Sequence, residues 1–361
     1  MVRRVKRRSP DAQIVITGCY AQLKPREIAS IEGVDLVVGA GEKFRISNHI
    51  QQLTKAGPTK ICSCDISEVT DFSGSYSLAG RTRTFLKVQD GCDYNCSFCT
   101  IPMARGRSRS HCVEHVLRDI ADIRDAGVKE IVLTGINLGD YGKNESGAKT
   151  GECFYDLLTA IESFQGVQRY RISSIEPNLL SDEIIRLVAS SKKIMPHFHI
   201  PLQSGSNSIL GAMRRRYRKE LYREKVENIR RLMPHCGIGV DVICGFPGES
   251  EQDFQQTFDF LEQLPVTYFH VFTYSERADT HALNIGPSVP MLIRHERTRV
   301  LRALSDEKAN TFFSQNKNSS RAVLFEGKGK NGMMEGYSDN YIRVKIPFNS
   351  RWENEIVEWT F

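Results

Sequence analysis

Three closely spaced cysteines in the first third of the chain constrain its fold and chemistry more than any other feature. Cys92, Cys96 and Cys99 have the spacing C-x3-C-x2-C, and they directly follow an apolar, strand-like stretch at 85–89. A cubane 4Fe-4S cluster has four irons, and cysteine thiolates usually bind all of them. Three thiolates on one short loop therefore predict a 4Fe-4S cluster in which one iron keeps an open position.

The open iron restricts what such a cluster can bind. It can chelate a molecule with an amine and a carboxylate on adjacent atoms, as in S-adenosylmethionine (SAM), and a reduced cluster with this cofactor produces radical chemistry. A zinc site is the alternative, but zinc normally takes four ligands, in C-x2-C pairs or with histidines. The nearest further candidates, His111 and Cys112, stand at an unfamiliar spacing. The motif therefore favours a radical SAM site.

Length and composition are those of a soluble protein of several domains. The 361 residues, 40% of them hydrophobic, suffice for two or three domains with cores. No apolar stretch reaches about 18 residues, and the basic N-terminus at 1–8 lacks the apolar core of a signal peptide. We therefore expect a cytoplasmic monomer with no membrane contact, whose ten cysteines stay reduced and can bind clusters.

Short β-branched runs alternate with amphipathic helical stretches in the middle of the chain. The expected strands are 85–89, 130–134, 169–173, 197–202, 239–243 and 267–272, and the expected helices are 113–126, 155–163, 181–190, 219–233 and 251–264. Repeated strand–helix units predict an α/β fold with a parallel sheet and helices outside. Six units predict a partial (β/α)6 barrel over residues 84–315, with its chemistry at the C-terminal ends of the strands.

Glycine-rich or polar turns follow several of these strands. Gly135 and Asn137 follow the second strand, Gln203 and Ser204 the fourth, and Gly245 the fifth. Glycine lets the backbone approach a ligand closely, although ordinary turns between strands and helices also need it. Because three such turns share one end of the sheet, we expect these five residues to line the cofactor cavity.

Two basic regions suggest a nucleic-acid partner. The net charge is only +6, but nine basic residues stand between Arg214 and Arg231, and Arg215 and Arg218 are candidate phosphate contacts. Residues 319–361 read as short strands of a small antiparallel barrel, with Tyr337, Tyr341, Arg343 and Lys345 as candidates for an RNA-binding face. Alternatively, the basic run is simply the solvent-exposed face of a helix, and the aromatic residues fill the core of the small barrel instead of binding RNA.

Several motifs together resemble the radical SAM methylthiotransferases. They are T-G-C-Y-A-Q at 17–22, the cysteine loop through 102, A-R-G at 104–106, and P-L-Q-S-G-S at 201–206. The motifs I-S-S-I-E-P at 172–177, M-R-R-R-Y at 213–217 and F-T-Y-S at 272–275 are most similar to the MtaB branch. That branch modifies tRNA carrying N6-threonylcarbamoyladenosine beside the anticodon. The resemblance extends from about residue 9 to the C-terminus.

The resemblance implies a mechanism with two clusters. The cluster on Cys92, Cys96 and Cys99 would cleave SAM to a 5'-deoxyadenosyl radical that removes hydrogen from C2 of the modified adenine, and Phe98 would lie beside the adenine of the cofactor. A second cluster would supply sulfur, and a second SAM would supply the methyl group. An electron donor and a sulfur donor are also needed, and the sequence identifies neither. The terminal barrel resembles the TRAM domain, an RNA-binding module.

The N-terminal part departs from the family pattern. Family members have three cluster cysteines in their N-terminal domain, of which this sequence has Cys19, while Cys62 and Cys64 fall in the segment 51–83, which reads as a linker. We therefore expect residues 1–50 to be a remnant of that α/β domain in an N-terminally truncated chain, with an incomplete second cluster site at Cys19. The other functions considered are methylthiolation of a ribosomal protein and an RNA-binding remnant without sulfur transfer.

Overall fold

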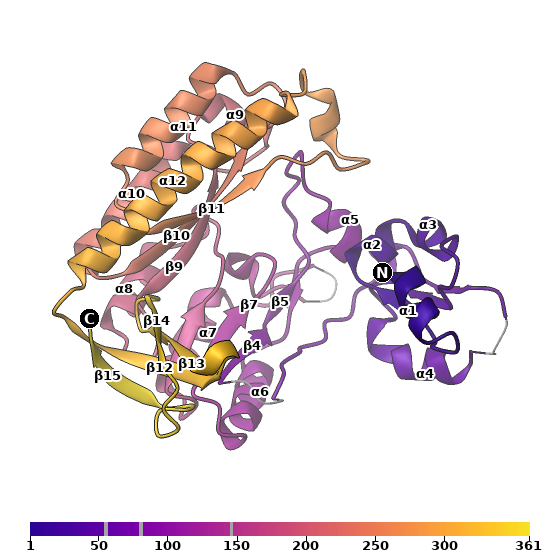
Figure 1. The fold of residues 1–361 in the computed structure, drawn as a ribbon, viewed down its shortest axis with the longest axis horizontal. Coiled ribbons are helices and arrows are strands. Elements are labelled where there is room, and N and C mark those ends of the chain that lie inside the picture. The colour runs from indigo at the N-terminus through magenta and orange to yellow at the C-terminus, as the bar shows by residue number, and fades with distance from the viewer. Residues whose placement is uncertain (54–56, 79–81, 145–146) are drawn as a thin grey trace.

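Six parallel strands form the centre of the molecule. The computed structural model describes residues 1–53, 57–78, 82–144 and 147–361. The strands are β4 (Arg83–Lys87), β7 (Glu130–Thr134), β8 (Arg169–Ile172), β9 (His197–Gln203), β10 (Gly237–Cys244) and β11 (Tyr268–Thr273). They pair as β4-β7-β8 and β9-β10-β11, and parallel bridges between Tyr170 and Ile194 and between Ser174 and His199 connect the two sheets. The predicted partial (β/α)6 barrel is confirmed, with β4 and β11 as its edges (Figure 1).

Helices cover the outside of this barrel. They are α6 (Val113–Asp125), α7 (Phe154–Ser163), α8 (Asp182–Ser190), α10 (Lys219–Leu232), α11 (Glu251–Gln263) and α12 (Met291–Gln315). Helix α6 shows why these segments are helical, because Val116, Ile120 and Ile123 recur on one face and are all buried. Five of the six helices were predicted, whereas α12 was not. Among the described residues, no helix is both long enough and apolar enough to span a membrane.

Successive strand residues point alternately to the helices and to the barrel interior. On β9, Phe198 and Ile200 belong to the large apolar core under the helices. His197 and His199 alternate with them and therefore face the interior. On this strand, the side that faces the barrel interior therefore carries polar side chains.

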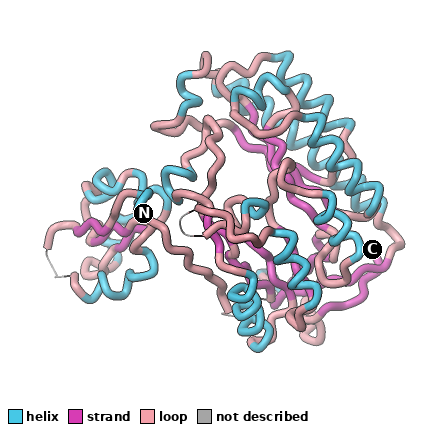
Figure 2. The backbone as a smooth tube through the Cα atoms, turned by 180° about the vertical axis from the view of Figure 1, so that it is seen from behind, coloured by secondary structure: helices cyan, strands magenta, loops and turns pink. Residues whose placement is uncertain are grey.

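A small α/β unit precedes the barrel. Its parallel sheet has the order β1 (Val15–Thr17), β2 (Leu36–Val38), β3 (Lys60–Cys62). Helices α1 (Val2–Arg8), α2 (Cys19–Leu23), α3 (Pro25–Ala29) and α4 (Ile46–Gln51) surround it. Figure 2 shows this unit beside the barrel. Strand β3 lies inside the segment predicted as a linker and pairs with β2, and the predicted domain boundaries stay a proposal.

The C-terminal segment forms an antiparallel sheet with the order β14-β13-β12-β15. Its strands are β12 (Ser320–Lys328), β13 (Met333–Ser338), β14 (Arg343–Pro347) and β15 (Ile356–Thr360). The antiparallel character is confirmed, with β14 and β15 as the edges, and the likeness to a TRAM domain stays a prediction. The sheet packs against the N-terminal ends of the barrel strands, where Arg171 Nη1 donates to the carbonyl of Asp339 at 3.0 Å. It therefore lies at the end of the barrel opposite to the cysteine loop.

Candidate cluster and cofactor site

The cysteine loop connects the short strand β5 (Gln89–Asp90) with helix α5 (Ile101–Arg105) at the C-terminal end of the barrel. Its path depends on Gly91, which has a φ of 72° and whose missing Cβ would lie 1.9 Å from the carbonyl oxygen of Arg107. Only glycine tolerates both the left-handed backbone and this close approach. The loop then returns, and the amide of Cys92 donates to the carbonyl of Gly106 at 3.1 Å.

The three cysteine thiols are largely buried, and this burial raises the pKa of each. Burial raises the pKa of Cys92 to about 12, and Cys96 and Cys99 act in the same direction. Each sulfur also has a donor. The amides of Tyr94 and Ile101 lie 3.4 Å from the sulfurs of Cys92 and Cys99, and Arg215 Nη1 lies 3.2 Å from the sulfur of Cys96. Three thiols with such donors fit a cluster, which binds them as thiolates and whose potential depends on hydrogen bonds to sulfur.

Gln89 holds the base of the loop together. Its buried amide nitrogen donates to the carbonyl of Gly91 at 2.8 Å and to Ser108 Oγ at 2.9 Å. Its amide oxygen accepts from the backbone of Asn137 at 2.8 Å. Gln89 therefore fixes the cysteine loop to the turn that follows β7.

That turn contains two of the predicted cofactor residues. Gly135 is required by packing, because a Cβ there would lie 2.8 Å from the side-chain oxygen of Gln89. Asn137 is 2% exposed, yet neither its amide oxygen nor its amide nitrogen has a hydrogen-bond partner among the described residues. A buried amide without partners costs free energy, so Asn137 fits the cofactor role that its position predicted.

Of the other predicted cofactor residues, two are hydrogen-bonded within their own turns, and two have no such bond among the described residues. Ser204 is buried and bonds to Thr257 at 3.2 Å, and Gly245 donates its amide to Glu249 at 2.7 Å, so both already stabilise their own turns. Gln203 has a left-handed φ of 68° at the end of β9, which is unusual for a residue other than glycine. Phe98 packs edge to face on Phe246, with ring centroids 6.3 Å apart.

Arg215 lies in a different place from the one predicted. We expected an RNA contact, but its side chain is 4% exposed and forms an ion pair with Glu176, the glutamate of the I-S-S-I-E-P motif. Burial alone would lower the pKa of Arg215, but Tyr217, Glu176 and Cys96 together hold it well above its usual value. Arg215 therefore places a fixed positive charge beside a predicted cluster ligand.

Cys19 lies next to the same region. Its sulfur is 3.2 Å from Nε of Arg105 on α5, and the same guanidinium lies 3.5 Å from Asp90. The structure thus connects the N-terminal cysteine to the helix that follows Cys99. Cys62 lies 3.5 Å from Nδ1 of His49, and Cys64 lies near Gly41 in the loop after β3.

The remaining RNA candidates are spread over the molecule. Arg218 is exposed directly before α10. Arg343 and Lys345 are exposed on β14 and share one partner, Glu335, with 4.0 Å between Lys345 Nζ and the carboxylate. Tyr341 instead stacks on His197 at 4.3 Å, and its ring lies 4.8 Å from the guanidinium carbon of Arg171, so it packs between the sheet and the barrel.

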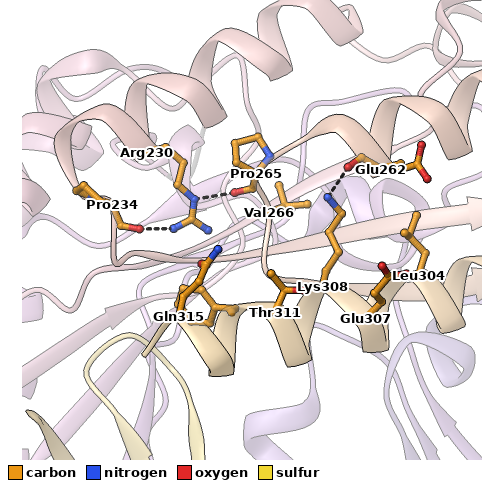
Figure 3. A pocket seen from close by; sticks show the side chains of 11 residues that line it. Arg230, Pro234, Glu262, Pro265, Val266, Leu304, Glu307, Lys308, Thr311 and Gln315 are labelled. Atoms are coloured by element: carbon orange, nitrogen blue, oxygen red, sulfur yellow. Dashed lines mark hydrogen bonds between the residues drawn. The ribbon is translucent and has the colours of Figure 1, made fainter. Parts of the chain in front are cut away.

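Two of the cavities among the described residues have lysine and arginine side chains in their walls. One of about 480 Å³ lies on the outside of the barrel between α10, α11 and α12, before the start of β11, far from the cysteine loop along the strands (Figure 3). Its Arg230 and Lys308 already donate to backbone carbonyls such as those of Pro265, at 2.7 Å, and Glu262, at 2.6 Å. The two cations of this cavity are therefore already engaged by the backbone.

The other cavity, of about 360 Å³, lies between the N-terminal unit and β4. Lys43, Lys87 and Arg109 line it around Asp90. Burial lowers the pKa of Lys43, and the neighbouring charge of Lys87 lowers it further. The walls of the cavity carry four cationic side chains and four carboxylates, Glu42, Glu68, Asp71 and Asp90, so it has no excess of positive charge.

Comparison with known proteins agrees with this geometry. Residues 86–261 match the radical SAM superfamily model. The chain is 38% identical over 353 residues to the threonylcarbamoyladenosine tRNA methylthiotransferase MtaB of Bacillus subtilis (strain 168), covering 95% of this chain and 77% of that protein. The chain belongs to the radical SAM methylthiotransferase family. It is therefore an enzyme of the class that uses a 4Fe-4S cluster with SAM.

Two further proteins place this methylthiotransferase within its family and fold. A tRNA-2-methylthio-N(6)-dimethylallyladenosine synthase of Syntrophus aciditrophicus (strain SB) is 33% identical over 341 residues, covering 94% of this chain and 71% of that protein. The radical SAM methyltransferase TsrM of Kitasatospora setae superimposes with a TM-score of 0.56 at 15% identity, covering 74% of this chain and 56% of that chain. The second comparison shows a shared fold alone.

Proposed function

We propose that this enzyme adds a methylthio group to C2 of N6-threonylcarbamoyladenosine beside the anticodon of tRNA. The observation that carries the proposal is the 38% identity to a threonylcarbamoyladenosine tRNA methylthiotransferase, which extends over 95% of the chain and includes the three-cysteine loop. Identity to the dimethylallyladenosine synthase is lower, at 33%. Both relatives are named for tRNA substrates, which favours tRNA over a ribosomal protein.

Cys92, Cys96 and Cys99 are the proposed ligands of the radical SAM cluster. When bound, the cluster with SAM supplies one-electron reduction and hydrogen abstraction. Arg215 would stabilise negative charge at the Cys96 sulfur, because its guanidinium lies 3.2 Å away and is held there by Glu176. The unpartnered amide of Asn137 would orient the cofactor, and Phe98 would contact its adenine.

Cys19 is the proposed ligand of a second cluster. Arg105 supports this role, because its Nε lies 3.2 Å from the Cys19 sulfur and places a positive charge beside it. The position of Arg105 on α5 brings this cysteine to the same end of the barrel as the radical SAM loop. Sulfur insertion requires such proximity, since both centres must reach one substrate carbon.

Three exposed residues, Arg218, Arg343 and Lys345, are the proposed phosphate contacts. They lie near opposite ends of the barrel, so an RNA touching both regions must extend along the barrel. The eight residues of β10 span about 26 Å at roughly 3.3 Å per residue.

Nucleoside analysis tests this function. The full chain is reconstituted anaerobically with iron and sulfide and incubated with SAM, a reductant and tRNA that carries either N6-threonylcarbamoyladenosine or N6-dimethylallyladenosine. We expect 5'-deoxyadenosine formation that is lost in the triple variant C92A/C96A/C99A, and we expect any 2-methylthio product to come from the first substrate alone. Product from the dimethylallyl substrate instead would refute the assigned substrate.

A further inference from the structure

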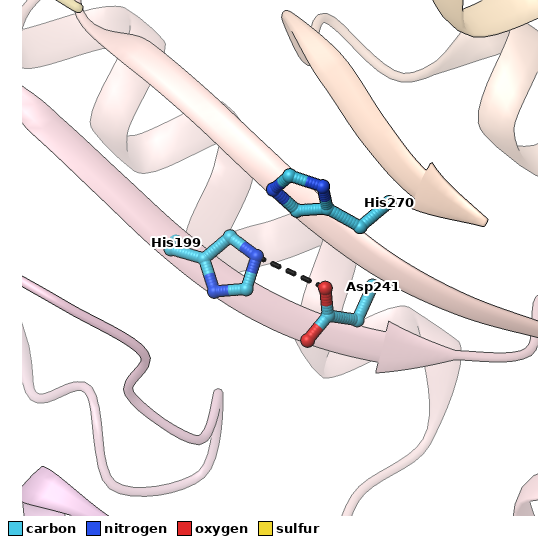
Figure 4. Close-up of side chains that lie close together, drawn as sticks. All are labelled: His199, Asp241 and His270. Carbon is cyan, nitrogen blue, oxygen red and sulfur yellow. Dashed lines mark ion pairs between the residues drawn. The ribbon is translucent and has the colours of Figure 1, made fainter. Parts of the chain in front are cut away.

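Three potential metal ligands converge inside the barrel, away from the cysteine loop. His199 on β9, Asp241 on β10 and His270 on β11 come from three adjacent strands (Figure 4). Asp241 and His270 are direct neighbours in the register of β10 and β11. All three alternate with core residues, so they face the interior at mid-strand. Neither the cluster chemistry nor the RNA contacts proposed above make use of them.

The ligand atoms lie at distances that a single ion can bridge. One nitrogen or oxygen from each residue lies within 4.8 Å of the other two. Nε2 of His199 and Oδ1 of Asp241 are 3.0 Å apart. Ligands about 2.1 Å from a tetrahedral zinc are about 3.4 Å from one another. Side-chain movements of about 1 Å would therefore complete the site without a change in the backbone.

The pair of His199 and Asp241 is not a satisfied hydrogen bond. Despite the 3.0 Å separation, its geometry falls outside that of a hydrogen bond, and Nε2 of His199 is buried with no other partner in the described part of the chain. A nitrogen directed at a carboxylate without a well-placed proton is available, together with that carboxylate, to a cation that lies to one side of the pair. This is the feature that separates the cluster from an ordinary buried ion pair.

A second contact orients the histidine in the manner common to metal sites. Nδ1 of His199 lies 2.6 Å from Oγ of Ser174, which is bridged to β9 through its backbone. Ligating histidines almost always use their other ring nitrogen in a hydrogen bond, which fixes the tautomer and the ring orientation. In the tautomer whose Nδ1–H donates to Ser174, Nε2 carries the lone pair that a metal requires.

We propose that His199, Asp241 and His270 bind one divalent first-row transition ion, of the zinc or ferrous class, inside the barrel. Two imidazoles and one carboxylate suit these ions, whereas calcium and magnesium prefer sites made of oxygen. Three protein ligands leave at least one position open toward the interior. A polar group of a bound substrate, or water, would occupy that position.

Zinc binding to the full-length chain tests this proposal. Because ten cysteines also bind zinc, the measurement must identify the ligands, and X-ray absorption at the zinc edge distinguishes nitrogen and oxygen neighbours from sulfur. The chain is loaded with Zn²⁺ on the triple-cysteine background C92A/C96A/C99A. We expect one equivalent with a shell of nitrogen and oxygen alone, lost in H199A, D241N and H270A.

Two further variants make the result specific. S174A keeps every ligand and removes the orienting bond, so its zinc affinity should fall by about 10- to 100-fold. H295A removes an exposed histidine on α12 and should bind as the parent does. Circular dichroism and thermal melting establish that each variant is folded, and D241N changes the shape of the side chain least. A zinc shell of sulfur alone, or an equal zinc content in the parent and D241N, would overturn the proposal.

Discussion

Glu130 is the buried carboxylate on which the junction between barrel and C-terminal sheet depends. Its side chain is fully buried, and it lies 3.1 Å from Arg169, 3.2 Å from Arg171 and 4.0 Å from Arg83. The substitution Glu130→Gln keeps the shape but removes the buried negative charge that pairs with Arg169 and Arg171. Removing one partner of a buried ion pair costs about 3–5 kcal/mol, because the remaining charges stay buried without compensation.

The structure places the expected cost at the lower end of this range. Arg171 keeps the carbonyls of Ser338, at 3.2 Å, and Asp339, at 3.0 Å, and Arg83 keeps Glu326 at 2.7 Å. We therefore expect a loss of about 3 kcal/mol in the free energy of unfolding. At about 2–4 °C per kcal/mol for a domain of this size, the melting temperature should fall by roughly 6–12 °C.

Urea titration followed by circular dichroism measures this loss, and Glu326→Gln is the matched control. Glu326 pairs with the same Arg83 but is 37% exposed, so its loss should cost at most about 1 kcal/mol. Burial alone would raise the pKa of Glu130, but Arg171 and Arg169 hold it below its ordinary value. Its stabilisation is therefore complete above the unfolded pKa and is lost as the pH falls through the folded pKa. Equal losses in the two variants would refute the reasoning.

Three further predictions concern the active site and the RNA. The triple-cysteine variant should form no 5'-deoxyadenosine, and wild-type rates measured by chromatography would disprove the cluster assignment. Arg215→Met should shift the potential of the radical SAM cluster to more negative values by on the order of 60 mV, the equivalent of a tenfold change in a one-electron equilibrium, and an unchanged potential in an EPR titration would contradict this. Charge reversal at Arg218 and Arg343 should weaken tRNA binding and reduce its salt slope by about one unit for each lost contact, while an unaltered slope would return both residues to the solvated surface.

The barrel strands could be predicted because each is a short apolar run between polar turns. The expected strand 130–134 coincides with β7, and the other five differ from the observed strands by at most two residues at either end. Helix α12 escaped prediction because its apolar residues form no single stripe. It buries Arg294 and Arg297, whose guanidiniums bond to Tyr274 and Glu249. Tyr274 and Glu249 lie far from these arginines in the sequence, so a local pattern of residues cannot predict the contacts.

The role of Arg215 shows a second limit of sequence reasoning. Three consecutive arginines read as one basic patch, but Arg214 adopts a left-handed φ of 57° directly after α9 (Asn207–Ala212). The chain turns there, so Arg215 points inward to Cys96 while Arg216 contacts the carbonyl of Asp93 at 2.9 Å. Tyr341 differs from its predicted place for a related reason. An aromatic residue on a short strand suits a protein contact as well as an RNA base, and here it meets His197.

The contact between Arg105 and Cys19 has a consequence for how the enzyme is assembled around its substrate. Helix α5 has five residues and a length of about 7.5 Å, with the radical SAM loop at its start and the Cys19 contact at its end. A nucleobase bound at this end of the barrel, as proposed above, would therefore meet both cysteine regions at once. If Cys19 binds a cluster as proposed, the N-terminal unit would form one side of the reaction site, and sulfur would reach the substrate without a large movement of either unit.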